Sequence, residues 1–223
     1  MSQNFFKRLL SSIILLPFSL FVVIKGSLLF NFLLIFCFVI SCYEWIMLSQ
    51  NKSYKLYGFL YFLISFTLIY FLRNNLGNDF NYFLFVILIC IFTDLGGYIF
   101  GKVIKGPKLT SLSPKKTFSG MIGGFILSQS IIILLFTSNF KIPYLTLKKT
   151  TLDIELIIFI FLISSFSQIG DIIISYYKRQ ANIKDTGKLI PGHGGLLDRL
   201  DGIILACPLS YLFLKFEIFT FFK

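Results

Sequence analysis

Charged residues are scarce in this chain of 223 residues. Only 14% are Asp, Glu, Lys or Arg, whereas about 25% is usual in a soluble domain. Hydrophobic residues make up 56% of the chain, which excludes a water-soluble globular core of this length. The apolar stretches are long and continuous, not short and alternating, so a transmembrane β-barrel is excluded as well. We therefore expect an all-α, polytopic helical integral membrane protein.

Side chains that commonly bind transition metals are also few. His193 is the only histidine, which excludes a metal site built on two histidines. The four cysteines all lie inside apolar segments, and none has metal-ligand spacing to another cysteine or to histidine. We interpret them as reduced packing residues. They are Cys37, Cys42, Cys90 and Cys207.

The chain contains no internal repeat, proline-rich linker or low-complexity tail. It therefore predicts a single membrane domain over residues 1–223. Within it we expect N-terminal helical spans over residues 1–77. A second helical region, which carries loops 101–117 and 178–201, is expected over residues 78–223.

Seven apolar segments approach the length of about 20 residues that a spanning helix needs. We expect about seven transmembrane helices, within a range of six to nine. Only Lys25 and Gly26 separate the first two, which predicts a tight hairpin or a bent pair. The predicted spans are residues 9–24, 27–48, 56–72, 80–100, 118–136, 154–177 and 202–222.

Positive charge dominates, with 21 Lys and Arg against 10 Asp and Glu and a formal net charge of +11. In a soluble chain this excess would suggest nucleic acid. Beside apolar spans it indicates cytoplasmic loops and anionic headgroups, so we expect no nucleic-acid partner. With the N-terminus in the cytoplasm, most cations fall in inside segments, as the positive-inside rule requires. Loops 101–117 and 178–201 then share the cytoplasmic side of the inner membrane.

Four acidic residues lie within or at the edge of apolar segments, where an ionisable side chain is costly and is a functional candidate by default. They are Glu44, Asp94, Asp171 and Asp201. We interpret Glu44, which stands beside Trp45 near a predicted membrane edge, as an interfacial residue. Asp94 precedes glycines in the spacing that allows close helix packing. These glycines are Gly97 and Gly101, with Gly120 and Gly124 in the next span.

Asp171 belongs to a polar stripe along the span 154–177. Ser164, Ser167, Ser175 and Lys178 recur with it at helical spacing. Hydrogen bonding between helices is the alternative explanation for the serines alone. The explanation fits Asp171 less well, because an unpaired carboxylate in a span is expensive.

Asp198 and Asp201 are three residues apart, which places them on one face where the last predicted span begins. A capping role at a helix N-terminus is one explanation. The other is a Mg²⁺ site, since Mg²⁺ takes one or two carboxylates together with substrate phosphates. We expect Asp171 and Asp198 to hold the metal, with Asp94 and Asp201 acting directly or through water.

Two loops are suited to phosphate. Loop 101–117 carries five lysines and no acid, and ends in Lys115, Lys116 and Thr117. Its cations attract polyphosphate, although lipid headgroups explain the first three lysines equally well. In loop 178–201, Gly194 and Gly195 allow close approach of a ligand to the backbone. His193 is either an ordinary turn residue or a contact to phosphate or base.

The run from Ser175 to Asp201 resembles the signature of the phosphatidate cytidylyltransferase family, also called CDP-diacylglycerol synthases. The match is long and gapless, and with upstream motifs the resemblance covers roughly residues 90–208. Ile174 and Ser119 depart from it, because many members have Glu there. The matching residues are Ser175, Lys178, Arg179, Lys184, Asp185, Gly187, Ile190, Pro191, His193, Gly194, Gly195, Asp198, Arg199 and Asp201.

The resemblance implies transfer of CMP from CTP to phosphatidate in phospholipid biosynthesis, giving CDP-diacylglycerol and pyrophosphate. It also implies Mg²⁺, with room for a second, monovalent cation, and a homodimer in the lipid bilayer. The catalytic residues it implies are Asp171, Lys178, Arg179, Asp198 and Arg199. The substrate-binding residues are Lys115, Lys116, Thr117, Ser175, Lys184, Asp185, His193, Gly194 and Gly195. The metal ligands are Asp171, Asp198, Asp94 and Asp201.

Two other functions remain open at this point. A CTP-dependent polyprenol or phytol kinase belongs to the same broad superfamily, and it releases CDP where a cytidylyltransferase releases pyrophosphate. An ion-coupled transporter would use Asp94 and Asp171 as an ion path. The transporter leaves the glycine-rich loop with its histidine unexplained.

Overall fold

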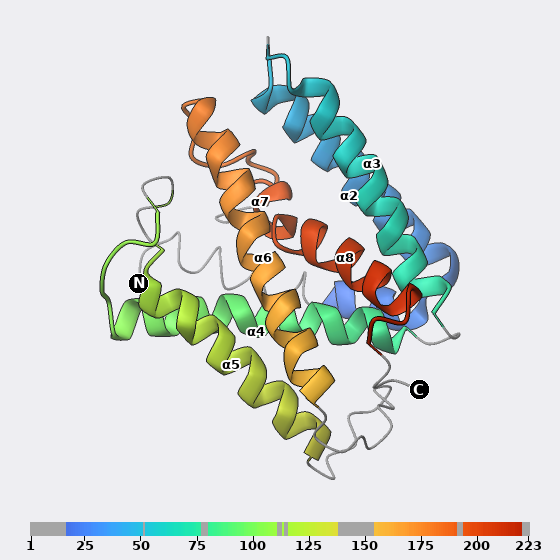
Figure 1. Cartoon of the computed structure of the whole chain (residues 1–223). Coiled ribbons are helices and arrows are strands. Elements are labelled where there is room, and N and C mark those ends of the chain that lie inside the picture. Colours follow the sequence, from blue (N-terminus) through green and yellow to red (C-terminus); the bar gives the residue numbers. More distant parts are fainter. Residues whose placement is uncertain are drawn as a thin grey trace.

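The computed structural model describes residues 17–50, 52–76, 80–110, 113, 116–137, 154–190 and 194–219. These residues form helices joined by loops, which confirms the all-α prediction (Figure 1). Residues 17–25 are helical and lead directly into α2. The further helices are α2 (Ser27–Leu48), α3 (Lys55–Asn74), α4 (Asn81–Val103), α5 (Phe118–Thr137), α6 (Ile154–Gln180), α7 (Leu197–Leu200) and α8 (Ile203–Lys215).

Helices α2 to α6 are each long and apolar enough to cross a membrane. Large apolar side chains point outward from them, among them Leu28 and Phe32 on α2 and Tyr57 and Ile64 on α3. An apolar exterior is what a lipid environment requires, because lipid tails replace water around the helices. The chain is therefore a membrane protein.

The expected count of seven spans is not confirmed. The predicted span 9–24 begins outside the described residues. The predicted span 202–222 corresponds to α8, which has 13 residues and contains Pro208. A helix of that length rises only about 20 Å, whereas the hydrocarbon core is about 30 Å thick. The apolar stretch is long enough in sequence, but its helix ends at Lys215.

Gly26 joins the first helical segment to α2, as the short Lys25–Gly26 connection predicts. Its φ of 61° lies in the left-handed region that favours glycine. A Cβ atom there would also lie 1.8 Å from Nη2 of Arg73. That guanidinium donates to the carbonyl of Val23 and lies over the ring of Phe30. The join is thereby fixed to the end of α3.

Figure 1 shows α2 and α3 side by side, α8 between them and α6, and α6 crossing α4. Two apolar clusters fill these interfaces. The larger includes Ile89 on α4 and Phe159 and Ile163 on α6. The smaller gathers around Trp45 on α2 and includes Ile174 and Leu197. It packs against loop 178–201, one of the polar segments discussed in the next subsection.

Glycines bring α4 and α5 into close contact, as their spacing predicts. A Cβ atom at Gly120 would lie 2.7 Å from the carbonyl oxygen of Gly97. One at Gly124 would lie 2.9 Å from the carbonyl oxygen of Thr93. The two backbones therefore approach more closely than side chains would allow. This contact sets where α5, and the loop that precedes it, lie relative to α6.

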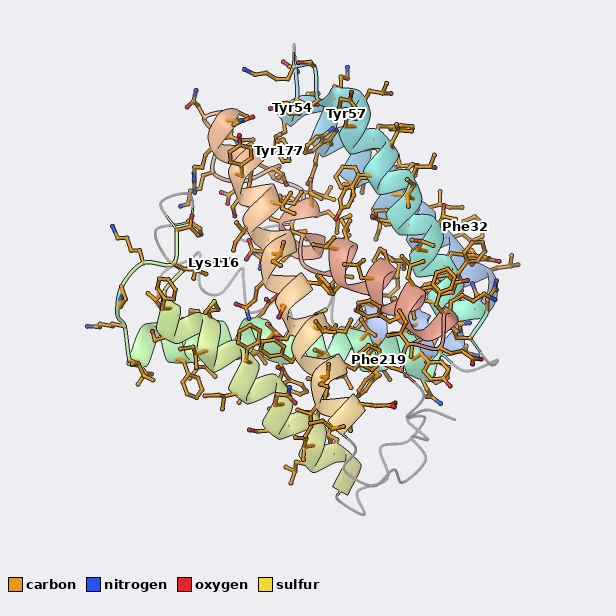
Figure 2. The ribbon with its side chains drawn as sticks, viewed as in Figure 1. Phe32, Tyr54, Tyr57, Lys116, Tyr177 and Phe219 are labelled. Carbon is orange, nitrogen blue, oxygen red and sulfur yellow. The ribbon has the colours of Figure 1, made fainter. Side chains whose placement is uncertain are left out.

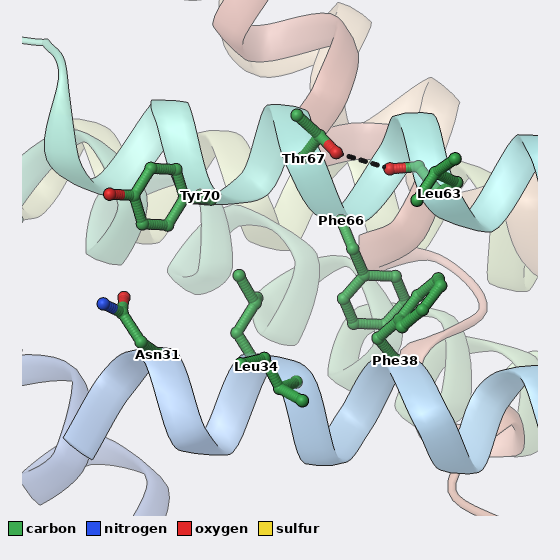
Figure 3. A pocket seen from close by; sticks show the side chains of 8 residues that line it. Asn31, Leu34, Phe38, Leu63, Phe66, Thr67 and Tyr70 are labelled. Carbon is green, nitrogen blue, oxygen red and sulfur yellow. Dashed lines mark hydrogen bonds between the residues drawn. The ribbon is translucent and has the colours of Figure 1, made fainter. Parts of the chain in front are cut away.

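An open groove of about 390 Å³ lies between α2 and α3 (Figure 3). Phe38 and Phe66 face each other in it, and Asn31 and Tyr70 lie toward one end. Among the described residues no charged side chain lines it, so these residues offer no cation there to bind phosphate. The charged residues gather elsewhere, around the C-terminal half of α6.

Candidate functional site

The polar stripe of α6 divides into two parts with different roles. Ser164 is fully buried and accepts a hydrogen bond of 2.8 Å from the hydroxyl of Thr93 on α4. This contact confirms interhelical hydrogen bonding for that serine. Further along α6, Ser175 donates to Asp171 Oδ1 at 3.2 Å. The C-terminal half of the stripe thus carries the charged residues toward the loops.

Lys116 forms an ion pair with Asp171, which joins loop 101–117 to α6. Figure 2 labels Lys116 on this loop. The loop turns back on itself, since the amide of Leu109 donates to the carbonyl of Lys116 at 2.8 Å. Thr117 then caps α5 by accepting from the amide of Gly120 at 3.1 Å. The side chains of Lys116 and Asp171 keep 25% and 30% of their surface exposed. This pair is therefore open to a ligand.

Lys178 and Asp198 form a second ion pair, at 2.7 Å between Nζ and Oδ1. It is more deeply buried, with 10% and 6% of the two side chains exposed. Oδ2 of Asp198 accepts from the backbone amides of Thr186 and Gly195, at 2.8 and 3.0 Å. A carboxylate with a cation and two amides around it has its charge well compensated. Asp198 thereby links α6, loop 178–201 and α7.

Glu44 is not interfacial; that prediction is wrong. The side chain leaves only 3% of the residue exposed, because it turns inward from α2 onto loop 178–201. Oε1 accepts from the amide of Leu196 at 2.9 Å, and Oε2 accepts from the amide of Leu197 at 2.9 Å. The hydroxyl of Thr186 donates to Oε2 at 2.6 Å. Sequence reasoning missed both Glu44 and Thr186 as parts of this region.

One signal in the sequence did point to Glu44. An acid inside an apolar segment is a functional candidate by default. The neighbouring Trp45 favoured a membrane-edge role instead. In the structure the indole nitrogen of Trp45 donates to the carbonyl of Lys55 at 3.0 Å, and its ring packs on Tyr177 with centroids 4.9 Å apart. Trp45 thus fixes α2 against α3 and α6, beside the loop that Glu44 contacts.

Asp201 lies where α6 meets the start of α8. A Cβ atom at Gly170 would lie 2.5 Å from the carbonyl oxygen of Asp201, so glycine allows this close approach. Burial raises the pKa of Asp201 well above its usual value, and the charges of Asp171 and Asp94 raise it further. These three carboxylates therefore act on one another. Asp198 instead faces Lys178 and the loop amides.

The carboxylates do not form a ready-made metal cage. Within the described ranges, no group of three His, Cys, Asp or Glu side chains is placed to hold a metal ion. Their chemistry nevertheless suits Mg²⁺, which usually takes one or two carboxylates and completes its shell with water and substrate phosphates. A cation would also relieve the repulsion between Asp171 and Asp201.

The remaining predicted cations lie on the surface of the same region. Arg179, Lys184, Lys188 and Arg199 are exposed, as is Asp185. The backbones of Ile190 and Gly194 pair through hydrogen bonds of 3.0 and 3.2 Å, and Gly194 has a φ of 94°. Lys115 and His193 lie outside the described residues.

A family model described as the cytidylyltransferase family matches residues 53–217. The chain belongs to this family. It is 36% identical over 215 residues to the phosphatidate cytidylyltransferase of Rickettsia felis. That alignment covers 94% of this chain and 92% of the relative. The chain is 35% identical over 213 residues to the phosphatidate cytidylyltransferase of Rickettsia typhi, covering 94% and 91%. With that of Staphylococcus haemolyticus it shares 35% over 167 residues, covering 74% and 57%.

The resemblance noted from the run Ser175 to Asp201 is thus confirmed at the family level. The matched range also begins earlier than residue 90, so it takes in α3 as well as the charged loops. Glu44 precedes that range. The enzymes among the relatives favour a nucleotidyltransferase over a transporter.

Proposed function

We propose that this chain is a phosphatidate cytidylyltransferase, which transfers CMP from CTP to phosphatidate and releases pyrophosphate. Family membership and near full-length relatives of that name support it. The structural observation that carries the proposal is the pairing of Lys116 with Asp171 and of Lys178 with Asp198. The two pairs bring both charged loops to the C-terminal half of one helix.

The chemistry asks little of the protein beyond positioning and charge. The phosphate of phosphatidate attacks the α-phosphorus of CTP, and the bond from that phosphorus to the β-phosphate oxygen breaks. The attacking phosphate is already anionic at neutral pH, so no strong general base is required. Catalysis then depends on alignment and on cations that neutralise the phosphates. A site of lysine, arginine and aspartate side chains suits this reaction.

Each residue has a distinct part in the proposal. Lys116, in its open pair with Asp171, binds substrate phosphate when CTP enters. Arg179, Lys184 and Arg199 add positive charge at the exposed rim, and Lys178 holds Asp198 in place. Predicted contacts from Lys115 and His193 stay part of the proposal, although neither lies within the described residues.

Mg²⁺ belongs to the proposal as the charge-neutralising cofactor. Asp171 and Asp201 are the first candidates to hold it, because the charge of Asp171 raises the pKa of Asp201 and a bound cation would offset both negative charges. Asp94, which is exposed, and Asp198 complete the candidate set. When bound, Mg²⁺ would screen the phosphate charges and orient the phosphates. A second, monovalent cation and a homodimer remain parts of the same proposal.

The test uses the purified full-length protein in detergent with labelled CTP, phosphatidate and Mg²⁺. We expect a lipid-linked CDP product, release of pyrophosphate, and loss of both when EDTA replaces Mg²⁺. Asp198→Ala should abolish turnover, while Lys215→Gln, which removes an exposed cation on α8, should not. Release of CDP with phosphorylation of a polyprenol would identify a kinase instead. Full activity in Asp198→Ala would refute the assignment of this site.

Orientation has its own test. The proposal places the site on the cytoplasmic face of the inner membrane. A cysteine replacing Lys188 should react with a membrane-impermeant maleimide only in inverted vesicles. One replacing Asn75, at the C-terminal end of α3, should react only in intact spheroplasts. The reverse labelling pattern would overturn the proposed orientation.

A further inference from the structure

We propose that Glu44 is a positioning residue, which holds loop 178–201 against α2 and thereby sets the place of Asp198 and Gly195 in the CTP site. The contacts between Glu44 and the loop do not depend on the proposed function. That the loop binds CTP does rest on the proposed function. Glu44 contacts the loop from behind, at Thr186, Gly187 and Gly195 to Leu197, and its carboxylate is fully occupied by loop donors, so it acts through the loop.

The carboxylate of Glu44 is bound entirely by loop and helix donors. Two backbone amides and one hydroxyl occupy it, at 2.9, 2.9 and 2.6 Å. No lysine or arginine pairs with it in the part of the chain that the structure describes. Hydrogen bonds to an ionised acceptor are about twice as strong as neutral ones. A buried carboxylate held this way fixes the backbone that donates to it.

Two glycines make room for that carboxylate. A Cβ atom at Gly187 would lie 2.6 Å from Oε1 of Glu44, and one at Gly195 would lie 2.4 Å from Oε2. Either methyl group would push the carboxylate or the loop aside. These glycines therefore serve the fit between loop and α2. This observation is independent of the hydrogen bonds and indicates the same fit between the Glu44 carboxylate and the loop.

Thr186 connects the carboxylate of Glu44 to that of Asp198. Its hydroxyl lies 2.6 Å from Oε2 of Glu44 and 3.2 Å from Oδ2 of Asp198. Its backbone amide donates to the same Oδ2 at 2.8 Å. Because the hydroxyl carries one proton, the shorter contact to Glu44 takes it. A shift of Glu44 would therefore move Thr186, and with it the groups that orient Asp198.

The closing experiment compares Glu44→Gln with a matched control. A glutamine keeps the size but replaces one oxygen with an NH₂ group, which then opposes a backbone N–H donor. Ser41→Ala is the control, because Ser41 is buried one turn earlier on α2 and its hydroxyl has no partner among the described residues. Thr186→Val removes only the bridging hydroxyl, and Thr186→Ser retains it.

Limited trypsin cleavage after Lys184 and Lys188 reports on the loop without any substrate. We expect several-fold faster cleavage in Glu44→Gln and Thr186→Val, and wild-type rates in Ser41→Ala and Thr186→Ser. Thermal unfolding checks that each variant is folded, and Thr186→Val keeps the test available if Glu44→Gln is not. Wild-type cleavage rates in both Glu44→Gln and Thr186→Val would overturn the proposal.

Steady-state kinetics separate positioning from a structural role. A protein that is only partly folded loses apparent kcat but keeps its KM values. A misplaced loop should instead raise the KM for CTP several-fold and leave the KM for phosphatidate unchanged. Faster cleavage with an unchanged KM for CTP would reduce Glu44 to a structural role and overturn the proposal. If the wild type shows no CTP turnover, the proposed function fails, while the trypsin comparison still decides whether Glu44 holds the loop.

Discussion

Lys178 and Asp198 lie 2.7 Å apart, Nζ to Oδ1, and join the last turn of α6 to the short helix α7. Asp198 also accepts the amides of Thr186 and Gly195. The pair thus connects the beginning of loop 178–201 to a residue near its end. Lys116 and Asp171 form a pair of the same chemistry but with more exposure. The different burial of the two pairs gives them different energetic roles.

Removing Asp198 should destabilise the protein as well as inactivate it. Asp198→Ala leaves the buried ammonium of Lys178 and two backbone amides without their acceptor. Breaking one side of a buried ion pair costs about 3–5 kcal/mol. We expect a clearly lower unfolding temperature in detergent, together with loss of CTP turnover. An unchanged unfolding temperature would contradict the structural part of this role.

Removing Lys116 should affect activity far more than stability. Exposed ion pairs contribute about 0–1 kcal/mol, and the pair with Asp171 is partly exposed. We expect Lys116→Gln to unfold within a few degrees of wild type but to lose CTP turnover by at least about tenfold, the size of effect that displaced substrate-positioning groups produce. Lys215→Gln is the control for loss of a cation. Normal turnover in Lys116→Gln would remove Lys116 from the site.

Two adjacent glycines on α4 should respond oppositely to alanine. A Cβ atom at Gly96 would lie 2.4 Å from the carbonyl oxygen of Gly123, whereas the nearest contact at Gly97 is 3.7 Å, to the carbonyl oxygen of Gly120. In an open position alanine favours a helix by about 1 kcal/mol over glycine. We expect Gly97→Ala to be neutral or stabilising. Gly96→Ala should separate α4 from α5 and lower both the unfolding temperature and turnover.

The charge on Asp201 should cost stability at neutral pH in metal-free protein. Burial and neighbouring carboxylates raise its folded pKa, so the folded state binds the proton more tightly than the unfolded state. Stability therefore falls as pH rises from the unfolded pKa, about 3.9, through the raised folded value. In EDTA, we expect Asp201→Asn to unfold at a higher temperature than wild type at pH 7. The gain should disappear near pH 4, and a pH-independent difference would contradict this account.

The sequence predicted the features that depend on local pattern. Apolar length located five spanning helices, and glycine spacing correctly predicted that α4 and α5 pack closely. The spacing of the matching residues in the run Ser175 to Asp201 correctly indicated the family. Each of these signals lies within a short stretch of chain, where periodicity or motif spacing is readable.

Contacts between distant parts of the chain were not readable in the same way. Glu44 and Thr186 are separated by 142 positions, and no local pattern indicates which buried acid meets which loop. The prediction of where the last span ends was wrong for another reason. Hydropathy measures how long an apolar stretch is, but not where its helix stops, and α8 covers only part of that stretch. Whether Asp171 and Asp198 share a metal stays a prediction.

The range that matches the family model starts at residue 53, while the carboxylate that seats loop 178–201 is at residue 44. A fragment cut to the matched range would keep the charged residues of both loops. It would nevertheless leave the amides of Leu196 and Leu197 without their acceptor. The space that Gly187 and Gly195 leave for the Glu44 carboxylate would be empty. The segment by which the family is recognised and the segment that must fold together are therefore not the same length. The folding unit reaches back into α2.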